Sequence, residues 1–274
     1  MMRCFDSHAH YNDKKFDQLP GGAEALLTKL FSENVSGIVN VGTNPDTNRQ
    51  VLSQAERYQQ MFAAVGIHPE DCHYLGDDPQ PYLEEIASLI ETDRQGAQKI
   101  VAIGEIGLDY HYEWYGTIPM DKEKQKDFLR RQLELARRLR LPVIIHDREA
   151  HGDIWEIVRQ YPEVKGVFHS FSGSRELAKD LVRIGWYVSF SGSVTFTNAE
   201  KVRLAAAAVP KDRLLIETDC PYLAPHPFRG QLNHSGLLSY TCETLAQVHG
   251  TTLREMAELT AENAKEFFAL QGRI

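Results

Sequence analysis

The sequence predicts a TIM (β/α)8 barrel, and three observations carry this prediction. Short apolar runs rich in β-branched and aromatic residues recur eight times along the 274 residues. Most of these runs are continuously hydrophobic, as expected of parallel strands that are buried on both faces. Segments with the apolar spacing of an amphipathic helix lie between them. Because barrels of this class run from about 200 to more than 400 residues, a single domain over residues 1–274 is expected.

The expected strands follow one another without a linker or an internal repeat. In order they are RCFDSH (3–8), GIVNVG (37–42), FAAVGIHP (62–69), IVAIGEIGL (100–108), PVIIH (142–146), GVFHSF (166–171), WYVSFSG (186–192) and RLLIETD (213–219). Helical spacing is clearest over residues 23–35, 81–93, 125–140 and 152–161. Two extra C-terminal helices, over 236–250 and 252–271, are expected to close or flank the barrel. The longest loop, 110–126 after the fourth strand, is aromatic and polar and is placed to cover a site.

Composition narrows the class of protein. The formal net charge of −8 argues against a protein that coats nucleic acid, because such binding needs Lys and Arg to neutralise phosphates. It leaves open an enzyme that holds a single phosphate with the help of divalent cations. The four cysteines form no C-x-x-C pair. Without a signal peptide or an apolar run of 18 residues, we expect a cytoplasmic protein with no membrane and no obligate protein partner.

Ligand-type side chains stand at or just past the C-terminal ends of the expected strands, where barrel enzymes build their active sites. The spacing of His8 and His10 would direct both imidazoles to the same side of a strand, although a pair of polar turn residues is the simpler reading of this motif alone. The whole set is His8, His10, His68, Glu105, Asp109, His146, His169, Glu217 and Asp219.

The predicted centre needs more than one metal ion. Glu105 lies in an otherwise apolar strand, so it requires a metal, an Arg partner or a proton. Asp219 ends the last strand, which closes against the first, and it either shares an ion with the histidines there or caps a helix. Six ligands are too many for one tetrahedral zinc and suit two ions that clamp a phosphoryl group, and the mixed nitrogen and oxygen donors permit Mg, Mn or Zn. The six are His8, His10, Glu105, His146, His169 and Asp219.

The sequence resembles the TatD family of metal-dependent deoxyribonucleases, within the amidohydrolase superfamily. The resemblance rests on DSHAH at the start, VGIHP (65–69), IGEIGLDYH (103–111), LPVIIHDREAH (141–151), FHSFSGS (168–174), SFSGSVTF (189–196) and LLIETDCPYLAPHPFRG (214–230). It implies that His8, His10 and Asp219 hold one metal, that His146 and His169 hold the other and that Glu105 bridges them. His68 and Arg229 would contact substrate phosphate. The implied activity is hydrolysis of DNA, largely as a 3′-to-5′ exonuclease on single strands.

Two residues depart from the family pattern in the loop RGQLNHSG. Arg229 and Asn233 match, but Gln231 stands where Lys is usual and Ser235 where Pro is usual. This departure predicts that the loop binds substrate differently.

Catalytic roles follow as hypotheses. Water activated by the two ions would attack phosphorus, Glu105 would position the ions, and Asp219 would accept or relay the proton. His68 and Arg229 would neutralise charge on the phosphoryl oxygens. Glu217 and Asp6 are expected to orient histidines, whereas Asp109 fits that role and a purely structural one equally.

Two further groups have a plain and a functional interpretation. The aromatic side chains Tyr110, Tyr112, Trp114 and Tyr115 would either stack on unpaired bases or pack their own loop. The arginines 130, 131, 137, 138 and 140 are better explained as a solvated helix face than as a DNA track.

Two other functions compete with a nuclease. One is an ester or amide hydrolase of the same design, acting on a dihydropyrimidine ring, a lactone or an aminoacyl ester on tRNA. Such enzymes often bridge their ions with a carboxylated Lys, and no Lys occurs at a strand end here, which favours phosphate chemistry. The other is a non-catalytic binding barrel, whose expected loss of ligands is not seen.

Overall fold

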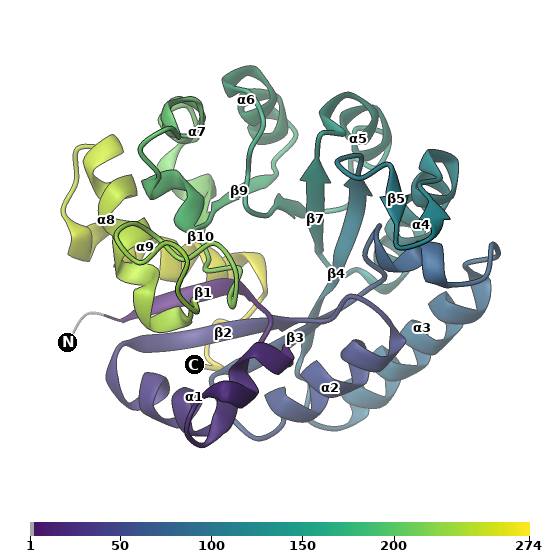
Figure 1. The fold of residues 1–274 in the computed structure, drawn as a ribbon, viewed down its shortest axis with the longest axis horizontal. Helices are drawn as coiled ribbons and strands as arrows, with labels where there is room; N and C mark the ends of the chain where they lie inside the picture. The colour runs from purple at the N-terminus through teal and green to yellow at the C-terminus, as the bar shows by residue number, and fades with distance from the viewer. Residues whose placement is uncertain (1–2) are drawn as a thin grey trace.

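Eight parallel strands form one sheet that curls into a nearly closed barrel, which confirms the predicted fold (Figure 1). The computed structural model describes residues 3–274. Neighbouring strands follow the order β1-β2-β3-β4-β7-β8-β9-β10. Their bounds are β1 Cys4–Ala9, β2 Val35–Val41, β3 Met61–Val65, β4 Ile100–Asp109, β7 Val143–Arg148, β8 Gly166–Phe168, β9 Tyr187–Phe190 and β10 Leu214–Ile216.

The barrel closes at a seam between β10 and β1. One isolated bridge joins Ala9 to Cys220 there. The backbone N–H of His10 donates to the Cys220 carbonyl at 2.8 Å, and the N–H of Asp219 donates to the His8 carbonyl at 3.0 Å. The chain past β10 therefore lies directly against the two histidines of the first strand.

Helices surround the sheet as an outer ring (Figure 1). The α-helices are α1 Gly22–Glu33, α2 Pro45–Ala55, α3 Gln80–Gln95, α4 Lys122–Leu139, α5 His151–Val158, α6 Arg175–Arg183, α7 Glu200–Ala206, α8 Leu238–Val248 and α9 Leu253–Phe267. Short 3-10 helices add η1 Lys14–Gln18, η2 Asp71–Tyr74, η3 Gly192–Thr195, η4 Lys211–Arg213 and η5 Ser235–Leu237. The arginines of α4 are exposed, and Arg137 pairs with Glu134 and Glu163, as expected of a solvated face.

The C-terminal segment closes the base of the barrel. Inward-facing side chains such as Phe5, Phe62 and Ile144 form an apolar cluster at the N-terminal end of the strands, together with Phe267 and Phe268 from the end of α9 and the residue after it. The expectation that the tail helices close the barrel is confirmed for α9. An apolar base leaves the opposite, C-terminal mouth as the polar end of the barrel interior.

The loop after β4 has a structure of its own. It carries a two-stranded ribbon, β5 Trp114–Tyr115 and β6 Ile118–Pro119, and ends where α4 begins at Lys122. The predicted loop of 110–126 is therefore too long by the first turn of α4. Asp121 caps that turn by accepting a hydrogen bond from the Lys124 N–H at 3.0 Å. Across residues 3–274, no helix combines the length and apolar character that a bilayer crossing requires.

Candidate metal centre

The six residues predicted as ligands converge at the C-terminal mouth of the barrel. A cavity of about 760 Å³ opens there, and five of the six line it, while His8 is fully buried beneath them. The five are His10, Glu105, His146, His169 and Asp219. Two of them lie in β4 and β7, and the others lie just past β1, β8 and β10, so strand geometry brings distant parts of the chain together.

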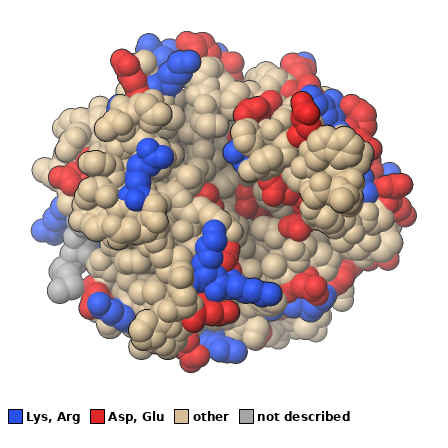
Figure 2. Space-filling view, viewed as in Figure 1, with Lys and Arg blue, Asp and Glu red and all other residues tan. Residues whose placement is uncertain are grey.

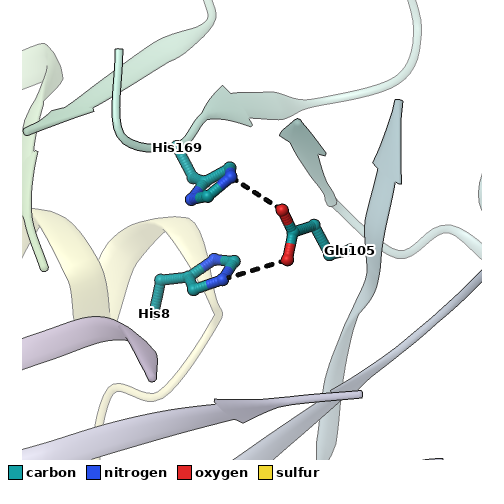
Figure 3. A group of neighbouring side chains, drawn as sticks. All are labelled: His8, Glu105 and His169. Carbon is teal, nitrogen blue, oxygen red and sulfur yellow. Dashed lines mark ion pairs between the residues drawn. The ribbon is translucent and has the colours of Figure 1, made fainter. Parts of the chain in front are cut away.

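Glu105 stands at the centre of the group, with its two carboxylate oxygens facing different histidines. Oε2 lies 3.3 Å from His8 Nε2 and 3.6 Å from His10 Nε2. Oε1 lies 2.8 Å from both His146 Nδ1 and His169 Nε2. Figure 3 shows His8 and His169 pointing at opposite oxygens of this carboxylate. One carboxylate thus divides the histidines into two groups, a disposition suited to bridging.

The first group joins His8 and His10 to Asp219. The Nε2 atoms of the two histidines are 3.0 Å apart, and Asp219 Oδ1 is 3.8 Å from the first and 3.5 Å from the second. The Val41 carbonyl, 2.9 Å from His10 Nδ1, can only accept, so Nδ1 carries the hydrogen and Nε2 of the neutral ring presents a lone pair. Three donor atoms therefore converge as they would around a cation.

The second group has its outer nitrogens fixed by carboxylates. His146 Nε2 donates to Asp109 Oδ2 at 2.9 Å, and His169 Nδ1 donates to Glu217 Oε1 at 3.1 Å. The inner nitrogens of the two neutral rings, 3.3 Å apart, then aim lone pairs at each other and at Glu105. Such an arrangement is repulsive unless protons or a cation lie between the atoms. The donor set fits a divalent metal, with the outer carboxylates fixing the tautomers.

The charges of the centre shift its pKa values. Burial would raise the pKa of Glu105, but the surrounding histidines, led by His169, outweigh burial and hold that pKa well below its ordinary range. Burial would likewise raise the pKa of Asp219, but the neighbouring imidazoles, led by His10, outweigh burial and lower that pKa. For His146, burial lowers the pKa, but hydrogen bonds to Asp109 and Glu105 prevail and raise it to about 9. The carboxylates stay ionised, as metal ligands must be.

Backbone geometry at the ends of β4 and β10 sets the positions of these ligands. A Cβ on Gly107 would lie 1.9 Å from the His146 carbonyl oxygen, so only glycine allows β4 and β7 to approach this closely. Asp219 has a φ of 57°, in the left-handed region that Asp tolerates better than most residues. Its carbonyl accepts a hydrogen bond from the Tyr222 N–H at 2.9 Å, which closes a turn directly after the ligand.

His68 has the opposite ring tautomer to His10. The Glu70 N–H donates to His68 Nδ1 at 3.1 Å, so the neutral ring carries its hydrogen on Nε2. That nitrogen faces the cavity, 3.4 Å from Glu105 Oε1. A hydrogen on Nε2 makes His68 a donor toward a ligand oxygen, the opposite of the lone pair that His10 offers.

Arg229 does not line the cavity. Its side chain is exposed, and its guanidinium lies 4.1 Å from the centre of the Phe196 ring. Sequence reasoning placed it on substrate phosphate, but in this structure it lies outside the cavity wall.

The atypical loop at 229–236 has a structural consequence at Ser235. Ser235 is buried, and its hydroxyl donates to Asp6 Oδ2 at 2.7 Å, which a proline could not do. The Thr218 hydroxyl donates to the same oxygen at 2.6 Å, and the Thr218 N–H donates to Oδ1 at 2.9 Å. Burial raises the pKa of Asp6 to about 6 against these hydrogen bonds. Asp6 therefore ties the loop and the chain before Asp219 to β1, rather than orienting a histidine ring.

The four aromatic side chains of the loop after β4 divide into two pairs. Tyr110 donates to Asp153 Oδ2 at 2.8 Å, and the buried Tyr115 donates to the Asp109 carbonyl at 3.1 Å, so both pack the loop. Tyr112 and Trp114 keep 44% and 59% of their surface exposed, and only Tyr112 lines the cavity.

Three further cavity residues escaped the sequence reasoning. Lys14, Arg148 and Tyr222 line the cavity; Arg148 and Tyr222 lie inside two of the quoted motifs but had no role assigned to them, and Lys14 lies outside the motifs. The signal that could have found Arg148 is its place two residues after His146, on the same side of the same strand.

Comparison with known proteins agrees with the geometry. The family model of the TatD related DNases matches residues 5–269. The chain is 37% identical to the uncharacterized metal-dependent hydrolase YabD of Bacillus subtilis, over 97% of this chain and 99% of that one. It is 34% identical to the uncharacterized metal-dependent hydrolase YcfH of Escherichia coli K12, over 99% and 97%. The crystal structure of YJJV, a TatD homolog from Escherichia coli K12, aligns with a TM-score of 0.86 at 30% identity, over 97% of this chain and 98% of that one.

Proposed function

The chain belongs to the family of TatD related DNases, and from this premise we propose that it is a deoxyribonuclease that uses two divalent ions to hydrolyse single-stranded DNA. Its relatives are metal-dependent hydrolases, and the chain is one as well. The observation that carries the two-ion proposal is the position of Glu105, whose two oxygens face separate groups of ligands. We further propose that digestion proceeds from the 3′ end.

The proposed ligands are His8, His10 and Asp219 for one ion and His146 and His169 for the other, with Glu105 between them. Bound Mg, Mn or Zn ions would supply Lewis-acid chemistry, polarising phosphoryl oxygens and making water more acidic. Asp109 and Glu217 would keep the two histidines of the second site in the tautomers that bind metal.

Asp219 is the better placed of the two central carboxylates to take a proton from the attacking water. The Glu105 side chain is only 4% exposed and is enclosed by imidazoles, whereas that of Asp219 is 16% exposed and lines the cavity. His68 would donate its Nε2 hydrogen to a phosphoryl oxygen on which charge develops. For Arg229 to contact the same phosphoryl oxygen, its guanidinium would have to move away from the Phe196 ring.

A second candidate function is supported by an acidic stretch of the cavity wall. Asp13, Glu70 and Asp71 line it, and carboxylates there would repel a polyanion but attract an ammonium group. This favours an aminoacyl ester, such as that of an aminoacyl-tRNA, as an alternative substrate. Two cations in the same wall, Lys14 and Arg148, support the phosphodiester.

The deciding experiment compares both substrate classes on one preparation. Protein freed of metal by a chelator would be reloaded with Mg, Mn or Zn and given single-stranded DNA labelled at the 5′ end, or an aminoacyl ester. We expect DNA products that shorten stepwise from the 3′ end and depend on the ion. Glu105→Gln should abolish cleavage, while Glu243→Gln on the exposed side of α8 should leave it unchanged. Ester cleavage with intact DNA would establish the second function, and an active Glu105→Gln would refute the bridging role.

A further inference from the structure

Arg148 is a cation without a partner, placed in the cavity wall. It ends β7, and its guanidinium lies 5.2 Å from the centre of the Tyr112 ring. The acidic residues on either side are already paired, Asp147 with His151 and Glu149 with His111, each at 2.7 Å. Within residues 3–274, no carboxylate forms an ion pair with this guanidinium and no acceptor forms a hydrogen bond with it. A guanidinium with free donors in the wall of a cavity can bind an anionic acceptor that a ligand brings.

A second aromatic and basic pair stands elsewhere on the wall. Tyr222 lines the cavity with 45% of its surface exposed, and its hydroxyl donates to Asp13 Oδ2 at 2.6 Å. The Lys15 amino group lies 4.0 Å from the centre of this ring. Lys14, the residue before Lys15, lines the same cavity, and among the described residues its amino group forms neither an ion pair nor a hydrogen bond.

The two pairs lie on opposite sides of the barrel mouth. In the ring of eight strands, β4 and β7 occupy the fourth and fifth places, and β10 and β1 occupy the eighth and first. Tyr112 follows β4 and Arg148 ends β7, whereas Tyr222 follows β10 and Lys14 follows β1. The line that joins the pairs therefore crosses the mouth over the metal centre. Figure 2 shows basic side chains at separate places around the central hollow and acidic side chains inside it.

Acidic side chains disfavour a phosphate chain on one side of the mouth, and Asp13 also lines the wall, where its carboxylate accepts the hydrogen bond from Tyr222. Glu70 and Asp71 follow β3, between the two pairs, and would repel phosphate. A strand of nucleic acid that crosses from one pair to the other keeps its phosphates near cations and its bases near tyrosine rings.

We propose that Tyr112 with Arg148, and Tyr222 with Lys14, form two nucleotide subsites on either side of the scissile phosphate. This proposal rests on the proposed function and adds how substrate is held. Each tyrosine stacks on one of the two bases that flank the cleaved bond, while Arg148 and Lys14 bind the neighbouring phosphates. The occupant is a single-stranded segment, because bases in a duplex would not be free to stack.

The test compares three tetrathymidylate substrates on each variant. The first is unmodified, the second has abasic sugars on both sides of the cleaved linkage, and the third has uncharged methylphosphonates in place of every phosphate except the cleaved one. The ratios of kcat/KM between substrates do not depend on how much of a variant is folded. For the wild type we expect kcat/KM to fall about 5- to 150-fold per base removed, as stacking implies.

Each substitution should reduce the preference for one feature of the substrate. Tyr112→Leu and Tyr222→Leu should each reduce the preference for bases, and the corresponding Phe variants should retain it. Arg148→Gln should reduce the preference for charged linkages by about 10- to 150-fold, because a hydrogen bond to a charged group is lost, and Lys14→Gln should act in the same direction.

Matched controls lie outside the cavity. Tyr74→Leu removes another exposed ring, and Arg138→Gln removes another exposed guanidinium, so both should leave the ratios unchanged. Variants of the four subsite residues that keep the wild-type ratios would overturn the subsites while leaving the nuclease intact. A wild-type protein that cleaves no tetranucleotide with any ion would instead refute the proposed function.

Discussion

Replacing Glu217 by Gln tests whether the buried carboxylate behind His169 sets metal affinity. Glu217 is fully buried, and its Oε1 accepts hydrogen bonds from His169 Nδ1 at 3.1 Å and from the Ser170 N–H at 2.8 Å. Its Oε2 has no partner among the described residues. Gln has nearly the same shape and can still accept both hydrogen bonds, so the substitution removes the charge with little change in packing.

The expected loss comes from the charge removed behind His169, because both hydrogen bonds also exist without the ion. Loss of a carboxylate that orients a metal-binding histidine typically weakens metal binding by about 10- to 100-fold, so we expect roughly 30-fold weaker binding of the ion held by His169. The site of His8, His10 and Asp219 has no contact with Glu217 and should keep its affinity.

Titration of the metal-free protein with Mn, by calorimetry and by activity, would measure this effect. Half-maximal activation should require about 30 times more ion, with kcat recovered at saturation. Glu243→Gln serves as the control, because that side chain is exposed on α8. An unchanged ion requirement would refute the positioning role. A lower kcat at saturating ion with unchanged affinity would place Glu217 in the chemical step instead.

Four further outcomes are expected. Removing metal with a chelator should lower the melting temperature by roughly 5 °C relative to protein at an ion concentration of 100 times the Kd, as calorimetry would show. Burial lowers the pKa of His73, whose Nε2 accepts a hydrogen bond from the Gln125 amide at 3.1 Å. Because the unfolded chain then binds more protons, the free energy of unfolding should fall as pH drops below about 6.5, by up to about 1.4 kcal/mol per pH unit. In His73→Phe, the free energy of unfolding measured with urea should depend less steeply on pH. Trp114→Ala should weaken binding of long single strands by about 5- to 150-fold. Unchanged affinity in a fluorescence titration would show that Trp114 is not part of the binding surface. Ser235→Ala leaves Asp6 with one hydrogen bond fewer, so the unfolding free energy should fall by about 1 kcal/mol and the ion requirement should rise.

The fold was predictable because buried parallel strands leave a strong signal. Every expected apolar run contains or overlaps a strand of the barrel. The ends were less predictable: the third run was expected to extend to residue 69, but β3 ends at Val65, and the last was expected to reach 219, but β10 ends at Ile216. In both runs the residues that follow the strand lie past the ladder, and they include His68 and Asp219.

Helices with little apolar character were not anticipated. α2 reads PDTNRQVLSQA, and its start is marked by hydrogen bonding instead of periodicity. The Asn44 side chain accepts from the Thr47 N–H at 3.0 Å, and the Thr47 hydroxyl accepts from the Asn44 N–H at 2.9 Å. A search for reciprocal caps would have located this helix where a search for an apolar face did not.

The convergence of the six candidate ligands could be anticipated from strand ends, but the hydrogen-bonding state of each histidine could not. His10 and His68 look equivalent in the sequence, as histidines that follow the first and third strands of the barrel. The acceptor next to His10 is the Val41 carbonyl, and the donor next to His68 is the Glu70 N–H. These backbone groups lie on different segments, and only their positions in space decide which ring offers a lone pair and which offers a hydrogen.

The seam between β10 and β1 links the unusual loop to the metal centre. A closed barrel normally holds neighbouring strands by a ladder of backbone hydrogen bonds, but this seam has a single bridge. Asp219, a ligand on one side, must nevertheless lie within about 4 Å of His8 and His10 on the other. Side chains supply the missing connection, because Asp6 accepts hydrogen bonds from Thr218 and Ser235 across the seam. A serine where proline is usual therefore strengthens the closure that holds His8, His10 and Asp219 close together, so the departure in this loop bears on the candidate metal centre.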